Sequence, residues 1–314
     1  MKKQAFLGIA IALLVLAGFL LWNHAAFFLK TPQKGTGKLS VVATFYPLAY
    51  FAEEIGGDRI LVKSIVPTGV EPHDYEPTPK NILTVNSADI FLINGAGLDP
   101  WAEKIRSGAE SRGVTVLEMS DKVALLSSET SKSKEVPTVF DPHFWLDPIL
   151  AETEVLAIRD ALISRDGDGS EVYAQNAKRL IEKLRALDQS YRGGLTYCGL
   201  RTVVTSHNAF AYLSKRYGFE TLSVSGLAPE AEPSPRRLVE LAETAKAKDI
   251  HFIFFETLVS PKVAETLARE IGAETLVFNP IEGLTQEDIA LKRDYFSIMN
   301  DNLKNLQKAL VCQE

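Results

Sequence analysis

The chain contains few of the residues that mark several common classes of protein. Only two of its 314 residues are cysteines, Cys198 and Cys312, so it is not a small scaffold held together by disulfides. It has 34 lysines and arginines against 40 aspartates and glutamates, a formal net charge of −6. Since there is no excess of positive charge to attract a phosphate backbone, we expect no nucleic-acid partner.

Signatures of the common enzyme classes are also missing. The sequence has no H-E-x-x-H helix, no P-loop and no G-x-S-x-G elbow. No glycine-rich loop with dinucleotide spacing follows the first predicted strand. We therefore expect a binding protein and not an enzyme.

The N-terminal segment predicts export from the cytoplasm. Lys2 and Lys3 precede an uncharged apolar run from Ala5 to Trp22, and no clean cleavage site follows it. The run is long enough to cross a bilayer, so residues 1–29 are either a cleaved signal peptide or, as we slightly prefer, an uncleaved membrane anchor. We interpret residues 30–38 as a flexible tether.

Either version of this segment places the body of the chain in the periplasm or on the outer face of the cytoplasmic membrane. Neither cysteine lies near the apolar run, so we expect no lipid anchor. In an oxidising compartment Cys198 and Cys312 can form a disulfide, although two separate thiols remain an alternative.

Short β-branched runs alternate with helical patterns, which predicts βαβ units and parallel sheets. The predicted strands are 40–44, 60–66, 90–93 and 114–117, followed by 202–205, 221–224, 250–255 and 275–278. A hydroxyl residue followed by proline marks the start of predicted helices at 79–87, 235–247 and 261–271.

A longer helix separates the two sets of strands. Apolar residues from Tyr173 to Tyr191 recur at spacings of four and three and form one stripe. We predict an α/β protein with two Rossmann-like lobes, residues 39–165 and 195–314, each with a mainly parallel sheet. A connecting helix within 166–194 joins them, although a helix packed inside one lobe is an alternative.

Three of the five histidines occupy similar places. His73 and His207 each follow a predicted strand, and His143 lies in a proline-framed loop before the next helix. Ligands of open α/β sheets bind beyond the carboxyl ends of strands, so the three side chains can meet in a cleft between the lobes. Neutral imidazole is a good ligand for Zn²⁺. The alternative is that the three are unrelated surface histidines. His251 lies within a predicted strand, and we interpret it as a core or edge residue.

Four motifs resemble those of the metal-binding (zinc and manganese) substrate-binding proteins of ABC transporters. They are GVEPHDYEPTP at 69–79, DPHFWLDP at 141–148, SHNAFAYL at 206–213 and GLAPEAEPSP at 226–235. The resemblance implies a metal in the cleft with His73, His143 and His207 as its ligands. It also implies that a monomeric receptor delivers the metal to the permease of an importer. Manganese receptors tend to carry glutamate where His207 stands, so the resemblance points to Zn²⁺ over Mn²⁺.

The sequence departs from the family pattern at the fourth ligand. The family often uses an aspartate where this chain has Asn279, so water, Glu282, Glu71 or Asn279 remain candidates. The loop near 120–138 also lacks the histidines that many zinc receptors carry there. Two other functions stay open, namely a membrane-tethered zinc hydrolase with an open fourth coordination position and a metal-binding adhesin of the cell surface.

Overall fold

The computed structural model describes residues 37–127, 139–229 and 233–313. The chain from Leu39 onward forms one compact unit. The predicted leader at 1–29 and nearly all of the tether at 30–38 lie outside the described residues. Within the described residues no helix is both long enough and apolar enough to cross a bilayer.

Two parallel four-stranded sheets have the same strand order. The first contains β1 (Leu39–Ala43), β2 (Ile60–Ser64), β3 (Ile90–Ile93) and β4 (Thr115–Glu118) in the order β2-β1-β3-β4. The second contains β5 (Thr202–Thr205), β6 (Glu220–Ser223), β7 (Phe252–Phe255) and β8 (Glu274–Val277) in the order β6-β5-β7-β8. The predicted fold class of two α/β lobes is confirmed, and the exact boundaries of the lobes stay a prediction.

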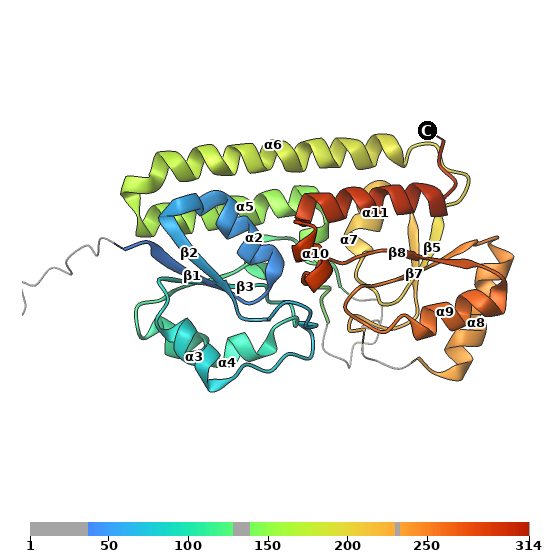
Figure 1. Cartoon of the computed structure of the whole chain (residues 1–314), viewed down its shortest axis with the longest axis horizontal. Coiled ribbons are helices and arrows are strands. Elements are labelled where there is room, and N and C mark those ends of the chain that lie inside the picture. The colour runs from blue at the N-terminus through green and yellow to red at the C-terminus, as the bar shows by residue number, and fades with distance from the viewer. Residues whose placement is uncertain (1–36, 128–138, 230–232, 314) are drawn as a thin grey trace, which may run out of the picture. The chain divides into compact units, whose positions relative to one another are not determined.

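Helices connect and cover the strands in each lobe (Figure 1). The first lobe has α2 (Tyr46–Gly56), α3 (Pro79–Asn86), α4 (Pro100–Glu110) and α5 (Pro148–Arg165). The second has α7 (Ala211–Tyr217), α8 (Pro235–Ala247), α9 (Lys262–Ile271), α10 (Gln286–Ala290) and α11 (Tyr295–Ala309).

The predicted side-chain caps are present at the N-termini of α3 and α8. Thr78 accepts a hydrogen bond from the backbone of Asn81, and Ser234 accepts one from the backbone of Arg237. The predicted start of α9 is wrong by one residue. Pro261 occupies the cap position with a helical backbone conformation (φ −74°, ψ −5°), and no side chain forms a capping hydrogen bond.

The connecting helix α6 (Ser170–Gly194) is longer than its apolar stripe. The predicted stripe is buried along the helix, and its residues are Tyr173, Ala177, Leu180, Leu184, Leu187 and Tyr191. α6 packs on α2 and α5 of the first lobe and on α11 of the second (Figure 1). One apolar cluster includes residues of both lobes and this stripe, so the two lobes share a core.

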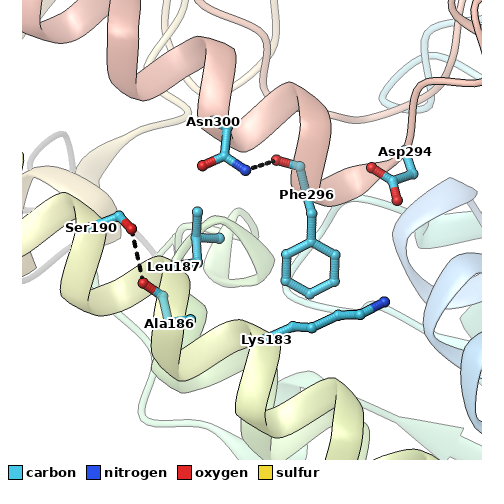
Figure 2. A pocket seen from close by; sticks show the side chains of 7 residues that line it. All are labelled: Lys183, Ala186, Leu187, Ser190, Asp294, Phe296 and Asn300. Atoms are coloured by element: carbon cyan, nitrogen blue, oxygen red, sulfur yellow. Dashed lines mark hydrogen bonds between the residues drawn. The ribbon is translucent and has the colours of Figure 1, made fainter.

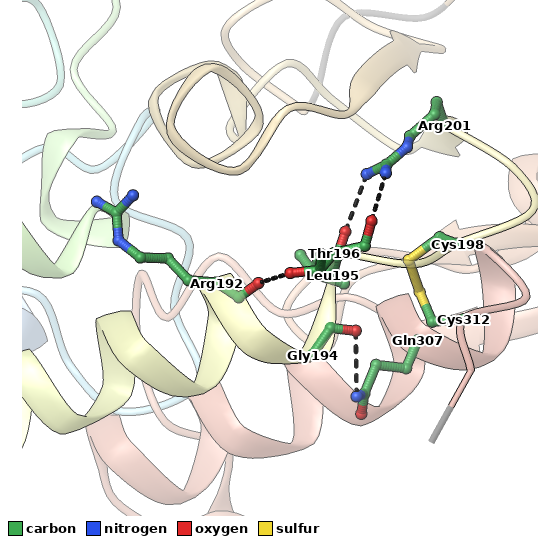
Figure 3. Close-up of a disulfide and its surroundings, with 8 residues drawn as sticks. All are labelled: Arg192, Gly194, Leu195, Thr196, Cys198, Arg201, Gln307 and Cys312. Atoms are coloured by element: carbon green, nitrogen blue, oxygen red, sulfur yellow. Dashed lines mark hydrogen bonds between the residues drawn. A yellow bond between two sulfur atoms is a disulfide. The ribbon is translucent and has the colours of Figure 1, made fainter.

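The predicted disulfide between Cys198 and Cys312 is present (Figure 3). It joins the segment after α6 to the segment after α11, and the two cysteines are 114 residues apart in the sequence. Backbone hydrogen bonds of 3.0 Å from Gly199 to Val311 and of 2.9 Å from Leu200 to Leu310 pair the same segments. The disulfide therefore reinforces a contact that the backbone already makes.

Candidate metal centre

Four segments bring one side chain each to a common point. His207 follows β5 by two residues, and His73 lies in the loop after β2. His143 directly precedes the short 3-10 turn Phe144–Leu146, and Glu282 lies in the loop after β8. The carboxyl ends of parallel strands thus bring side chains of both lobes together, as expected for open α/β sheets.

The four side chains place their donor atoms on a small tetrahedron. Nε2 of His143 lies 3.2 Å from Nε2 of His73 and 3.2 Å from Nε2 of His207. Oε1 of Glu282 lies 3.3 Å from each of these three nitrogens. These are five of the six distances between the donor atoms, and all four donors lie within 4.8 Å of one another. A regular tetrahedron with edges of about 3.3 Å would have its centre about 2.0 Å from each corner, which is close to a Zn–N bond.

The cluster is almost completely withdrawn from solvent. The side chains of His143 and His207 are 0% exposed and that of Glu282 is 1% exposed, whereas that of His73 is 6% exposed. Burial removes competing water from the donors and strengthens their interaction with a cation.

Buried carboxylates orient two of the three imidazoles. Nδ1 of His143 donates to Oδ1 of Asp141 at 2.7 Å, and Nδ1 of His207 donates to Glu256 at 2.7 and 2.8 Å. An ionised carboxylate can only accept, so Nδ1 carries the proton and Nε2 keeps a lone pair for a metal. Each carboxylate also accepts the backbone N–H of its histidine, at 2.9 Å for His143 and 3.1 Å for His207.

The same carboxylates change the pKa values of the two histidines. Burial works to lower the pKa of His207, but the charges of Glu256 and Glu282 raise it well above its usual value. Burial also opposes protonation of His143, yet Asp141 raises its pKa. A cation at the centre therefore has to displace protons from these imidazoles.

Burial and charge shift the pKa values of His73, Glu282 and Glu71 in other ways. Burial lowers the pKa of His73, and Glu282 does not compensate for it. Burial would raise the pKa of the Glu282 carboxyl, but the three histidines, His207 above all, hold it well below its usual range. Burial and the negative charge of Glu282 raise the pKa of Glu71 to about 10. Glu71 lies beside the cluster, and its Oε1 accepts the backbone N–H of His73 at 3.0 Å.

Among the candidates for the fourth ligand, Glu282 is the one whose oxygen reaches the three histidines. Asn279 instead shapes the loop, because its Nδ2 donates to Thr257 and its Oδ1 accepts from the backbone of Ile281 at 2.7 Å. Ile281 has φ of 58°, a left-handed conformation that a β-branched residue rarely adopts. This turn directs Glu282 toward the histidines.

Two of these residues were not predicted from the sequence. Asp141 lies within the DPHFWLDP motif, and Glu256 lies outside all four motifs. Glu256 directly follows β7, so the rule that located His207 after β5 also applies to it. His251, in contrast, precedes β7, and its side chain is 57% exposed beside Asp249. It is neither a core residue nor part of the cluster.

A hollow of about 280 Å³ lies between α6 and α11, away from the donor cluster (Figure 2). Lys183 and Asp294 are its charged residues. The Lys183 ammonium lies 5.5 Å from the centre of the Phe296 ring and 3.5 Å from Glu54, so neighbouring groups already balance it. This hollow offers no donor set comparable to the four-residue cluster.

Comparisons with known proteins agree with this geometry. The family described as zinc-uptake complex component A, periplasmic (ZnuA), matches residues 41–309. The chain is 38% identical over 281 residues to the high-affinity zinc uptake system protein ZnuA of Bacillus subtilis, which covers 87% of this chain and 88% of that protein. It is 36% identical to the zinc-binding lipoprotein AdcA of Streptococcus pneumoniae, over 92% of this chain and 60% of AdcA. The chain thus spans less than two thirds of the AdcA relatives.

Solved structures show the same fold. Zn(II)-bound AdcA from Streptococcus pneumoniae superposes with a TM-score of 0.77 at 38% identity, covering 87% of this chain and 58% of AdcA. The laminin-binding protein Lbp of Streptococcus pyogenes superposes with a TM-score of 0.76 at 30% identity, covering 87% of this chain and all of that one, 100%.

The expectation of a protein without a lipid anchor is contradicted by these comparisons. The AdcA relatives of Streptococcus pneumoniae are named lipoproteins. The expectation was based on the positions of Cys198 and Cys312. Both belong to the disulfide of the second lobe, so they carry no information on how the N-terminal part is held at a membrane.

Proposed function

The chain belongs to the ZnuA family of zinc-uptake components, and on this premise we propose that it is a receptor outside the cytoplasm that binds one Zn²⁺ and delivers it to an ABC-type importer. The observation that carries the proposal is the buried tetrahedron of His73, His143, His207 and Glu282. Members of this family are solute-binding receptors, which agrees with the expectation that the chain is not an enzyme.

The donor set supports zinc over manganese as the cargo. Three imidazoles and one carboxylate suit Zn²⁺, whereas Mn²⁺ prefers oxygen ligands in an octahedral arrangement. The donor spacing of 3.2 to 3.3 Å also fits four short bonds around one ion.

A metal titration of the purified protein tests this proposal. The wild type should bind one equivalent of Zn²⁺ and prefer it strongly to Mn²⁺ at equal free concentrations. His207→Ala should weaken zinc binding by several kcal/mol, because it removes one of four bonds to the metal. His251→Ala is the matched control, since His251 lies outside the cluster and is exposed. Unchanged zinc affinity in His207→Ala would exclude the proposed site.

The hydrolase alternative gains no support from the site. A catalytic zinc keeps one coordination position open for water, whereas here protein atoms supply all four corners of a tetrahedron. A zinc-loaded protein that hydrolysed activated esters would restore that alternative.

Adhesion is a second candidate function. Structural relatives are described as laminin-binding proteins, and one of them, from Streptococcus agalactiae, is described as bifunctional, with adhesin and metal-transporting activity. Binding of the purified protein to immobilised laminin, with and without zinc, tests this. Absence of saturable binding in both states would exclude it.

We also propose that the protein works as a monomer, since one chain supplies all four donors. Sedimentation with and without Zn²⁺ should give one species of 34.6 kDa or of its processed form.

The apolar run from Ala5 to Trp22 would add membrane attachment if it is not cleaved. The N-terminal residue of the mature protein, identified by mass spectrometry, decides this.

A further inference from the structure

One tyrosine of the second lobe holds the loop that carries His143. The hydroxyl of Tyr212, on α7, donates to the backbone carbonyl of Asp141 at 2.8 Å. The same hydroxyl accepts the backbone N–H of Leu126 at 2.8 Å. Asp141 in turn donates its N–H to the carbonyl of Leu126 at 2.8 Å, which closes a three-membered network. Tyr212 is 4% exposed, so water competes little with these bonds.

The network ends at the metal ligand. Asp141 is the residue whose carboxylate accepts both the backbone N–H and the Nδ1–H of His143. The Tyr212 ring also lies edge-on to Phe144, the next residue after His143, with ring centres 6.3 Å apart. Tyr212 thus contacts the residues on both sides of His143 without touching the imidazole.

A second side chain of α7 holds the other end of the same loop. Arg216, one helical turn beyond Tyr212, forms an ion pair with Asp147. Asp147 caps α5 by accepting the backbone N–H of Ile149 at 2.9 Å. The segment from Asp141 to Asp147 is therefore attached to α7 at both ends.

α7 is also the helix that follows His207. Its first residue is Ala211, and the loop before it is held by bonds from Asn208 to Gly226 and from Thr205 to His207. A single short helix therefore links the His207 loop of the second lobe to the His143 loop of the first. The Nε2 atoms of His143 and His207 are 3.2 Å apart, and both loops that carry them are attached to α7.

We propose that Tyr212 is a positioning residue of the zinc site, which fixes His143 relative to His207 through the backbone of Asp141. This inference rests on the proposed zinc-binding function. Burial raises the pKa of the Tyr212 phenol above its usual value, so the hydroxyl remains a donor at physiological pH. Without that donor, Asp141 loses one of the bonds that hold its carboxylate in line with Nδ1 of His143.

The test compares Tyr212→Phe with Tyr217→Phe in the full chain. Both tyrosines lie on α7 and are buried, and both substitutions remove only a hydroxyl. The hydroxyl of Tyr217 donates to Asp188 at 3.0 Å, away from the metal ligands. Zinc affinity is measured by competition with a chromophoric chelator, and coordination geometry by the visible absorption of the Co²⁺-loaded protein. The melting temperature of the metal-free protein reports on folding.

We expect Tyr212→Phe to bind one Zn²⁺ about tenfold more weakly than the wild type. This is the lower end of the effect seen when a direct partner of a metal ligand is removed, because Tyr212 acts through that partner, Asp141. Its Co²⁺ bands should shift or lose intensity, whereas those of Tyr217→Phe should match the wild type. Equal affinity and equal spectra for Tyr212→Phe and wild type would overturn the inference. So would an equal loss in Tyr217→Phe, which would mean that α7 is loosened in general.

Two further readouts keep the test decisive. If Tyr212→Phe does not fold, Arg216→Gln, which releases the other end of the loop, should change the Co²⁺ spectrum, and an unchanged spectrum would overturn the inference. If the wild type itself fails to bind zinc, the proposed function is wrong, a result distinct from the loss of the Tyr212 effect alone.

Discussion

At the scale of single residues, Glu256 decides which nitrogen of His207 faces the cluster. Both of its oxygens lie within 2.8 Å of Nδ1 of His207, and Oε1 also accepts the backbone N–H. The charge of Glu256 is the main influence that raises the pKa of His207 against the effect of burial. The carboxylate therefore both selects the tautomer and strengthens the imidazole as a ligand.

Glu256→Gln should weaken zinc binding about 10- to 100-fold, the range typical for an outer partner of a metal ligand. Glutamine has no negative charge, and its amide nitrogen can donate to Nδ1 and favour the wrong tautomer. Chelator competition measures the effect. Glu240→Gln on α8, where Glu240 pairs with the exposed Arg236, is the control and should bind like the wild type. Wild-type affinity in Glu256→Gln would show that the carboxylate is dispensable.

Glu154 is a buried carboxyl of α5 whose role is not in the metal site. It is 0% exposed, and neither of its oxygens has a hydrogen-bond partner in the described part of the chain. Burial raises the pKa of the Glu154 carboxyl well above its usual value. The folded protein therefore keeps Glu154 neutral over a pH range in which the unfolded chain ionises it.

The sign of the resulting pH dependence follows from proton binding. Below about pH 4.5 both states hold the proton and Glu154 contributes no pH dependence. As the pH rises above this value, the unfolded chain binds fewer protons than the folded one, so the free energy of unfolding falls. Glu154→Met removes the carboxyl and therefore this decrease in the free energy of unfolding. It should stabilise the zinc-free protein by about 1–3 kcal/mol near pH 7, and by more at pH 8 than at pH 5.

Urea unfolding at the two pH values measures the difference. Glu171→Gln, at an exposed position of α6, is the control, and its effect should not vary with pH in this way. If Glu154→Met raised the free energy of unfolding equally at both pH values, the carboxyl would have a hydrogen-bond partner or would ionise in the folded protein without loss of stability.

At the scale of elements, the ends of α6 and α11 are joined three times. A disulfide links Cys198 to Cys312, and backbone hydrogen bonds pair the segments on either side of it. In addition, Nε2 of Gln307 donates to the carbonyl of Gly194 at 3.3 Å (Figure 3). None of these residues belongs to the metal cluster. We therefore expect this clamp, made of the disulfide, the backbone pairing and the Gln307–Gly194 bond, to affect stability and not the donor cluster.

The double variant Cys198→Ser/Cys312→Ser should lose at most about 4–5 kcal/mol of stability, because the bridge closes a loop of more than 100 residues in the unfolded chain. Its zinc affinity should equal that of the wild type. Urea unfolding and chelator competition measure the two quantities. A large change in zinc affinity would show that the clamp is coupled to the site.

At the scale of the whole molecule, α6 restricts how the lobes can move. It is one continuous helix of 25 residues that packs on helices of both lobes, and its buried stripe belongs to a core that they share. Bending it would break backbone hydrogen bonds and expose this core. Metal capture should therefore rearrange the loops at the site with modest tilting of the lobes.

Solution scattering with and without Zn²⁺ tests this expectation. The radius of gyration should change by less than about 1 Å, out of roughly 20 Å for a chain of this length. The zinc-free His207→Ala variant is the control, since it binds zinc more weakly and should show a smaller change at the same zinc concentration. A larger decrease in the wild type would mean that the lobes close about a hinge.

The sequence by itself predicted the order and type of most elements and three of the four residues of the donor cluster. Strand and helix patterns are local, and β3, β5 and α8 have the predicted bounds because apolar runs and Ser-Pro caps act over a few residues. His73, His143 and His207 could be predicted because each lies in a loop at the mouth of an α/β lobe, and the resemblance to a family gave them one shared role.

Only the tertiary structure decided the rest of the site. Glu256 meets His207 across 49 residues of sequence, and Tyr212 meets Asp141 across 71, so no local pattern could pair them. Asn279 and Glu282 are three residues apart and were both open as ligands. The left-handed turn at Ile281, held by Asn279 itself, directs the Glu282 carboxylate inward, and such a backbone conformation arises from packing that a sequence pattern does not express.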